Sequence, residues 1–138
     1  MDALNAMTAL QAAALWSGLS ILLLIFLSVR TILTRRRVGV SFGDGGNPEL
    51  TAASRTFGNA AEYIPPCLAI LILMAVLDFQ PVWIHAVGGG MLLGRILHAW
   101  GLGQAKQPSF GRVSGMLLTQ AALIFGAGAL IGRAFGGL

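Results

Sequence analysis

Three polar side chains lie on one stripe in the middle of the sequence. Arg55, Asn59 and Glu62 are spaced i, i+4 and i+7, so an α-helix places them on the same face. Tyr63 lies beside this stripe. An arginine and a carboxylate on one face can bind the charged groups of a ligand, or pair with charges on a neighbouring helix. The segment leads into a long apolar run, and ionisable groups within a membrane face a bundle interior or a water-filled cavity.

The composition indicates an integral membrane protein. The chain has 138 residues, of which 56% are hydrophobic and 10% are charged, with a mean hydropathy of +0.78. Soluble domains carry roughly 25% charged residues. The net charge of +4 comes mostly from two connecting segments. The charge therefore reflects membrane topology, and we expect no nucleic-acid partner.

The apolar runs predict an all-α membrane protein, built as one four-helix transmembrane domain over residues 1–138. The expected spans cover about residues 6–29, 54–77, 82–103 and 112–131. Pro65 and Pro66 predict a kink in the second span. The polar linker at about residues 34–53 contains Gly-Gly and Asn-Pro, which predict an ordered turn.

The basic residues predict the orientation. Arg30, Arg35, Arg36 and Arg37 follow the first apolar run, whereas a signal peptide carries its positive charges before that run. These arginines and Lys106 outnumber Arg133 at the opposite side. The linker is therefore expected in the cytoplasm, with both termini outside and the helices in contact with membrane lipids.

Glycine spacing predicts where helices approach closely. Gly90 and Gly94 form a GxxxG pair in the third span. Gly128, Gly132 and Gly136 are also spaced by four and predict a second packing seam.

Charges of the second and third spans are expected at similar depths. Glu62 lies about 10 Å along the helix from Arg55, and Arg95 lies about 12 Å from the cytoplasmic end of its span. His98 shares the face of Arg95. A Glu62–Arg95 ion pair would neutralise both groups in a medium of low dielectric constant.

The remaining polar residues predict a vestibule that faces the cytoplasm. It would be lined by Arg55, Asn59, Tyr63, His98 and Arg112. Such a site is net positive and suits a small ligand with more than one carboxylate, while crevices toward the lipid would admit a hydrophobic small molecule. The same residues could instead form a structural ion-pair network that locks the bundle, with His98 in an interhelical hydrogen bond.

Other chemistry finds little support in the sequence. There is no H-E-x-x-H motif, no cysteine pair and no cluster of histidines and carboxylates, so no metal is expected. The single Cys67 excludes an intrachain disulfide, and the glycines of residues 43–46 lack the Gly-Lys-Ser/Thr of a phosphate-binding loop.

The pattern Arg55-x3-Asn59-x2-Glu62-Tyr63-x-Pro65, followed by a Gly-Arg-x2-His pattern over residues 94–98, resembles the MAPEG superfamily. These are membrane-associated proteins of eicosanoid and glutathione metabolism, and this chain looks like the small bacterial members. The resemblance implies a four-helix bundle in the inner membrane that assembles as a homotrimer. It also implies glutathione sites between subunits, in the cytoplasmic half.

The resemblance implies roles for individual residues. Arg55, Asn59, Glu62 and Tyr63 should bind glutathione or order its site, and Arg95 should join them. His98, on the face of Arg95, completes the substrate-binding candidates. Arg112 matches an arginine that holds glutathione as a thiolate, because a nearby cation lowers the pKa of a thiol. It is the candidate catalytic residue.

Two positions depart from the family pattern. Ala52 stands where the eicosanoid enzymes carry a second basic residue, and Leu102 stands where they carry a tyrosine. Two functions therefore remain open. One is a glutathione transferase or peroxidase that acts on hydrophobic electrophiles, and the other is a non-enzymatic lipid-binding or scaffold subunit. A transporter is disfavoured because the polar residues gather on one side of the membrane.

Overall fold

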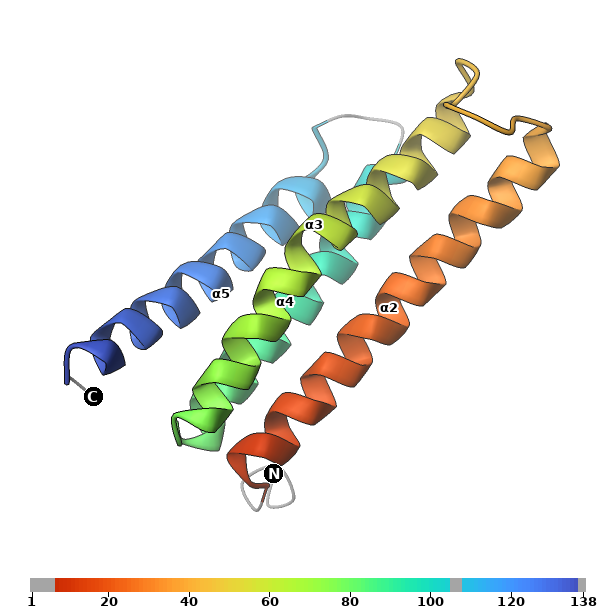
Figure 1. Ribbon diagram of the computed structural model, residues 1–138. Coiled ribbons are helices and arrows are strands. Elements are labelled where there is room, and N and C mark those ends of the chain that lie inside the picture. The colour runs from red at the N-terminus through yellow and green to blue at the C-terminus, as the bar shows by residue number, and fades with distance from the viewer. Residues whose placement is uncertain (1–6, 105–107, 137–138) are drawn as a thin grey trace.

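Four antiparallel helices make up the structure, a computed structural model that describes residues 7–104 and 108–136. The helices are α2 (Ala9–Val38), α3 (Pro48–Val76), α4 (Pro81–Leu102) and α5 (Phe110–Ala134). Figure 1 shows the α2–α3 linker and the start of α5 at one end of the bundle, hereafter the linker end. The α3–α4 turn, the start of α2 and the end of α5 lie at the other, the turn end. The predicted all-α fold is confirmed.

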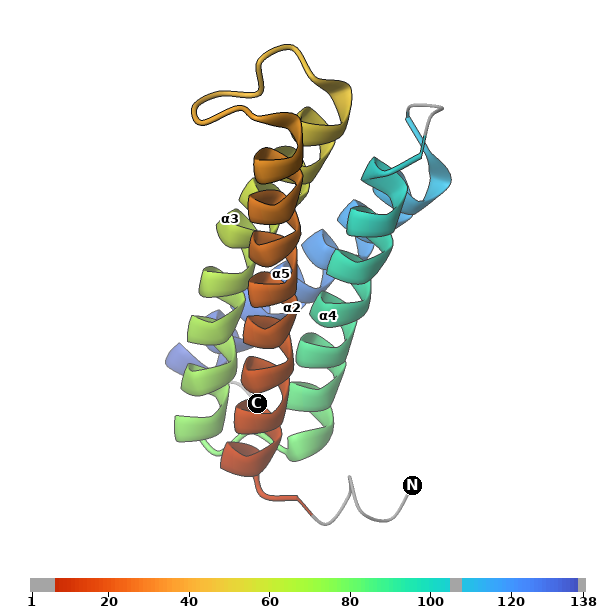
Figure 2. The same cartoon turned by 90° about the vertical axis from the view of Figure 1, so that its right-hand side faces the viewer.

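Three of the four helices are long and apolar enough to cross a membrane. These are α2, α3 and α5, whereas α4 is not apolar enough to qualify, although it occupies the third expected span. Glycines, two histidines and Arg95 lower its hydropathy. The helix contacts all three others, so a large part of its surface faces protein. In Figure 2, α5 is inclined to α4 and passes behind α3.

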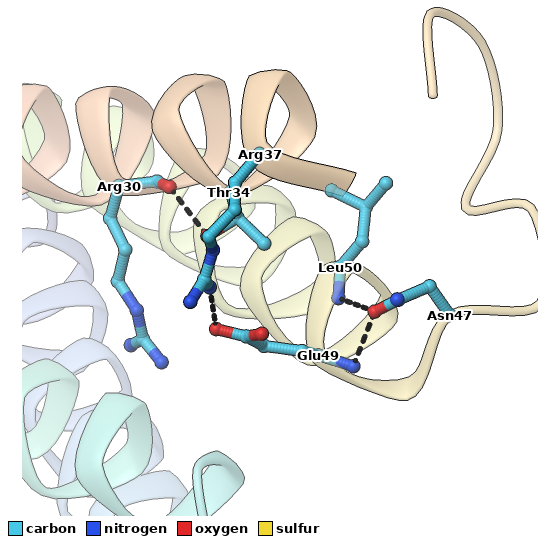
Figure 3. Close-up of polar contacts among 6 residues, drawn as sticks. All are labelled: Arg30, Thr34, Arg37, Asn47, Glu49 and Leu50. Carbon is cyan, nitrogen blue, oxygen red and sulfur yellow. Dashed lines mark hydrogen bonds and ion pairs between the residues drawn. The ribbon is translucent and has the colours of Figure 1, made fainter. Parts of the chain in front are cut away.

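Helices α2 and α3 extend beyond the predicted spans at the linker end, so the linker is shorter than expected. Helix α2 continues to Val38 and stops at Gly39, whose φ of 70° suits glycine. Helix α3 begins at Pro48, because the side chain of Asn47 accepts hydrogen bonds from the N–H groups of Glu49 and Leu50. Figure 3 shows this cap beside the ion pair of Arg37 with Glu49.

The linker is an ordered turn, as predicted. The Arg35 guanidinium donates to the carbonyls of Val40 and Gly43 at 3.1 and 2.8 Å. The Asp44 carboxylate accepts the Gly46 N–H at 3.1 Å and the Thr51 hydroxyl at 2.8 Å. These bonds favour the charged form and hold the pKa of Asp44 below its usual value.

Helices α4 and α5 meet backbone to backbone at Gly94 of the predicted pair, whereas a Cβ at Gly90 would make only an ordinary contact of 3.5 Å with Ala122. A Cβ atom added to Gly94 would lie 2.9 Å from the Gly115 carbonyl oxygen, and one at Gly101 would lie 2.0 Å from the Arg112 nitrogen. Only glycine permits this approach. At Gly128 and Gly136 of the other predicted seam the chain makes no close contact, since a Cβ at either would meet nothing within 4 Å.

Helix α3 runs unbroken through Pro65 and Pro66. Because proline has no N–H group, the carbonyls of Ala61 and Glu62 lack their usual i+4 donors at this point of the helix.

Candidate functional site

A cavity of about 660 Å³ lies between α3, α4 and α5, toward the linker end. We call it the polar pocket. Five of the seven predicted site residues line it. Its full lining is Arg55, Gly58, Asn59, Glu62, His98, Leu102, Pro108, Arg112, Val113, Met116 and Leu117. The helical stripe predicted from spacing therefore faces one cavity, opposite the start of α5.

Ser109 determines where Arg112 stands. Its hydroxyl donates to the Gly101 carbonyl at 2.7 Å and accepts the Arg112 backbone N–H at 3.3 Å, as the N-cap of α5. The first turn of α5 is thereby tied to the end of α4. Sequence reasoning missed Ser109, although a serine directly before a helical run is a recognisable N-cap signal.

Arg95 lies behind the polar pocket and does not line it. The residue is 2% exposed, and its Nε donates to Thr119 Oγ1 at 2.9 Å. A further guanidinium nitrogen donates to Asn59 Oδ1, and another approaches the Gly115 carbonyl at 3.5 Å. Because the Asn59 oxygen is held by Arg95, its amide nitrogen remains as a donor beside the pocket.

The predicted Glu62–Arg95 ion pair is wrong. Across residues 7–104 and 108–136, the ion pair that the structure contains joins Arg37 to Glu49. The Arg95 guanidinium has neutral acceptors on both sides, Thr119 and Gly115 of α5 and Asn59 of α3. Glu62 is exposed at the polar pocket. Helical periodicity predicted the face of each residue but not the direction of the arginine side chain.

Tyr63 also lies behind the pocket. Its ring stacks beneath Arg95, with 5.0 Å from the guanidinium carbon to the ring centre, a cation–π contact. Its hydroxyl accepts the Gln120 side-chain N–H at 3.4 Å. Gln120 and Thr119 on α5 were not among the predicted residues, because a single uncharged side chain in an apolar run carries no distinctive signal.

The charged groups of the pocket itself are available to a ligand. Within the described chain, the side chains of Arg55, Glu62 and Arg112 make no hydrogen bond or ion pair. Two cationic groups and one anionic group thus share a cavity with His98 and the amide of Asn59. The α5 side of the same cavity is apolar, with Val113, Met116 and Leu117. A zwitterionic ligand with excess negative charge complements this arrangement.

Comparison with known proteins identifies the family. The model of the MAPEG family matches residues 13–132. The chain belongs to the MAPEG family. It is also similar to two relatives named inner membrane protein YecN, from Escherichia coli strain K12 and from E. coli O6:H1 strain CFT073. Each is 36% identical over 91 residues, which cover 66% of this chain and 70% of the relative. This name gives their location and no activity.

Both departures from the MAPEG pattern lie at the site. Leu102 lines the polar pocket and also a neighbouring cavity of about 670 Å³, which Ala52 lines as well. The two cavities share Arg55 and Arg112. Residues 52 and 102 therefore both lie close to the candidate arginines. No group of three or more potential metal ligands occurs in the described part of this MAPEG chain.

Proposed function

We propose that this MAPEG protein binds glutathione in the polar pocket and transfers it to hydrophobic electrophiles that arrive through the membrane. The observation that carries the proposal is a single cavity with two available arginines, one available glutamate and an apolar side. Glutathione has two carboxylates, one ammonium group and one thiol. The arginines match the carboxylates or the thiolate, and Glu62, without an ion-pair partner among the described residues, matches the ammonium.

Arg112 has the electrostatic role in this reaction. A guanidinium stays protonated at neutral pH and cannot act as a base, so it stabilises the thiolate form of the bound ligand. The thiolate sulfur attacks the electrophilic carbon, a C–S bond forms, and the leaving group departs with the electron pair of the broken bond. With a lipid hydroperoxide, the sulfur attacks oxygen instead, and a second glutathione completes the reduction to alcohol, water and glutathione disulfide.

The proposed assembly is a homotrimer in which α4 makes the fourth crossing. Burial of α4 against the other three helices supports this, because a helix covered by protein tolerates lower hydropathy than one that faces lipid. The arginines of α2 favour the linker end as the cytoplasmic one, with both termini outside. The polar pocket is walled by α3, α4 and α5, and a neighbouring subunit would supply its remaining side.

A second candidate function is a non-enzymatic lipid-binding or scaffold subunit. The positions of Leu102 and Ala52 favour it, since both put apolar side chains beside the arginines where the eicosanoid enzymes have polar ones. Glutathione would then bind weakly or not at all.

Calorimetry and steady-state kinetics with 1-chloro-2,4-dinitrobenzene test the proposal. Arg112→Gln should lower kcat by about 100-fold with little change in glutathione affinity, as expected when one stabilising donor is lost. Arg55→Gln should raise Kd about tenfold, because a charge-assisted contact to the ligand is removed. Arg36→Gln is the matched control, since Arg36 is exposed on α2 and lines no part of the pocket. If the parent protein neither binds glutathione nor turns over the electrophile, the lipid-binding or scaffold function is the one that remains.

A further inference from the structure

A second cavity lies at the turn end, away from the polar pocket. It encloses about 630 Å³ and shares no residue with the polar pocket. Its walls include Phe79, Trp83, Phe125 and Gly128, and Asp78 and Arg133 also line it. We call it the turn-end groove. Cavities of this size hold small organic ligands or part of a lipid.

The apolar part of the groove is open at its surface. The Trp83 and Phe125 rings lie 5.6 Å apart at 42° and are 46% and 44% exposed. Gly128 lies in the same lining, and a Cβ added there would meet nothing within 4 Å. The groove therefore has space above Gly128 that the chain itself does not fill. Helix α5 is a candidate membrane span, so hydrocarbon is the natural occupant of that space.

The polar part of the groove carries one charge of each sign. Arg133 donates to the Leu77 carbonyl at 3.1 Å, and its guanidinium carbon lies 5.8 Å from the centre of the Phe79 ring. These contacts hold the guanidinium at the α3–α4 turn. Asp78 is exposed in that turn and has a φ of 54°, a left-handed conformation that aspartate tolerates better than most residues. A cationic and an anionic side chain thus both lie at the end of an apolar groove.

We propose that the turn-end groove binds a phospholipid whose headgroup carries both a phosphate and a primary ammonium group, as in phosphatidylethanolamine. Arg133 binds the phosphate, because a guanidinium fork matches its oxygens. Asp78 accepts hydrogen bonds from the ammonium. An acyl chain lies over Gly128, beside Trp83 and Phe125. The glycerol of phosphatidylglycerol carries no positive charge to offset that of Asp78, and a choline headgroup has no N–H to donate to it.

Native mass spectrometry of the delipidated protein in mild detergent tests the proposal. Phosphatidylethanolamine, phosphatidylglycerol and phosphatidylcholine with identical acyl chains are added separately, and the bound fractions are compared. Phosphatidylethanolamine should bind most. Gly128→Leu should reduce its binding about tenfold, because the leucine side chain would occupy the groove and leave at least two methylene groups of the acyl chain unburied. Gly18→Leu is the matched control, since a Cβ at Gly18 also meets nothing within 4 Å and Gly18 lies outside the groove.

The headgroup is tested by two further variants. Asp78→Asn should abolish the preference over phosphatidylcholine while the turn is kept, because asparagine also tolerates a positive φ. Arg133→Gln should weaken all three lipids, and its melting temperature shows whether loss of the Leu77 contact has harmed the fold. If Arg133→Gln does not fold, the Gly128 and Asp78 variants still test lipid binding in the groove.

Three results would overturn the proposal. These are stronger binding of phosphatidylglycerol, unchanged lipid binding in Gly128→Leu, and dissociation of an oligomer in Gly128→Leu, which would mean that a second copy covers the groove. Calorimetry of glutathione with Gly128→Leu should match the parent. The groove and the polar pocket are thereby tested separately.

Discussion

Glycine has different roles at the two ends of the bundle. At the linker end, Gly101 and Gly111 lie in the contact between α4 and α5, and an added Cβ would lie 2.0–2.6 Å from its nearest neighbour. At the turn end, Gly128 lines an open groove and an added Cβ would touch nothing. The residue type is the same, but close packing needs glycine at positions 101 and 111 and not at position 128. A glycine in an apolar helix permits close contact and does not by itself create it.

Polar side chains follow the same division. The linker-end half buries Arg95, Ser109 and Thr119 around the polar pocket, where Arg95 donates to Thr119 and Ser109 donates to the Gly101 carbonyl. At the turn end, Arg133 and Asp78 are exposed. Buried polar groups with fixed partners hold a defined geometry, which suits chemistry at the linker end. Exposed groups beside an open groove suit contact with a lipid, which is itself mobile.

The largest expected effect is the difference in stability between two glycine-to-alanine variants, one at each end, each of which adds one methyl group. Gly101→Ala should destabilise the protein by about 3 kcal/mol, because backbone atoms of α5 would have to move. Gly128→Ala should change stability by less than about 1 kcal/mol, and in the favourable direction, because alanine is the better helix former. Thermal or denaturant unfolding in detergent measures both. Equal losses in the two variants would mean that Gly128 also packs against something in the assembled protein.

The next effect compares the arginines of the two ends. Arg95→Gln should cost about 2 kcal/mol, because the buried acceptor on Thr119 and the half-buried one on Asn59 would lose their donor. Arg133→Gln should cost about 0.5 kcal/mol, as for most exposed polar contacts. Unfolding of the two variants beside the parent is the measurement. A larger loss for Arg133 would contradict the view that the turn end is the less constrained region.

Much of the fold followed from patterns along the sequence. Apolar runs separated by turn residues predict the order of the helices, and the capping residue Asn47 and the linker glycines explain the turn between the first two. The lengths of α2 and α3 were underestimated because polar helical turns continue past the apolar run. Hydropathy marks the part of a helix that suits lipid, whereas caps and glycines mark where the helix ends.

The candidate site was predictable to the level of helical faces. Spacing correctly grouped Arg55, Asn59 and Glu62, since residues at i, i+4 and i+7 must share a face. The partner of Arg95 was not predictable, because a long side chain can turn toward any of several helices. The neutral hydroxyl of Thr119 took the place assigned to a carboxylate. Charge balance was therefore a poor guide to the contacts of a buried arginine.

The smallest expected effect concerns the linker, where fixed polar contacts continue outside the membrane. Asp44 accepts hydrogen bonds from the Gly46 N–H and from the Thr51 hydroxyl. Both bonds keep its pKa in the folded state below the usual value for aspartate, and the bond from Gly46 has the larger effect. A lowered pKa means that the folded state holds the charged form more tightly than the unfolded state does. The resulting stability is present above about pH 4 and is lost as the pH falls through the lowered pKa of the folded state.

The melting temperature should therefore fall slightly more steeply with acid in the parent than in Asp44→Asn, which cannot titrate. Because Asp44 is at the solvent-exposed edge of the linker, the difference should be small. The acid sensitivity of the melting temperature in Thr51→Val should lie between those of the parent and Asp44→Asn. This variant removes the side-chain bond and leaves the one from Gly46. Melting curves at closely spaced pH values below about 5 are the measurement. If the parent and Asp44→Asn lose stability in parallel, the acid sensitivity arises from other carboxylates and the linker bonds do not contribute to it.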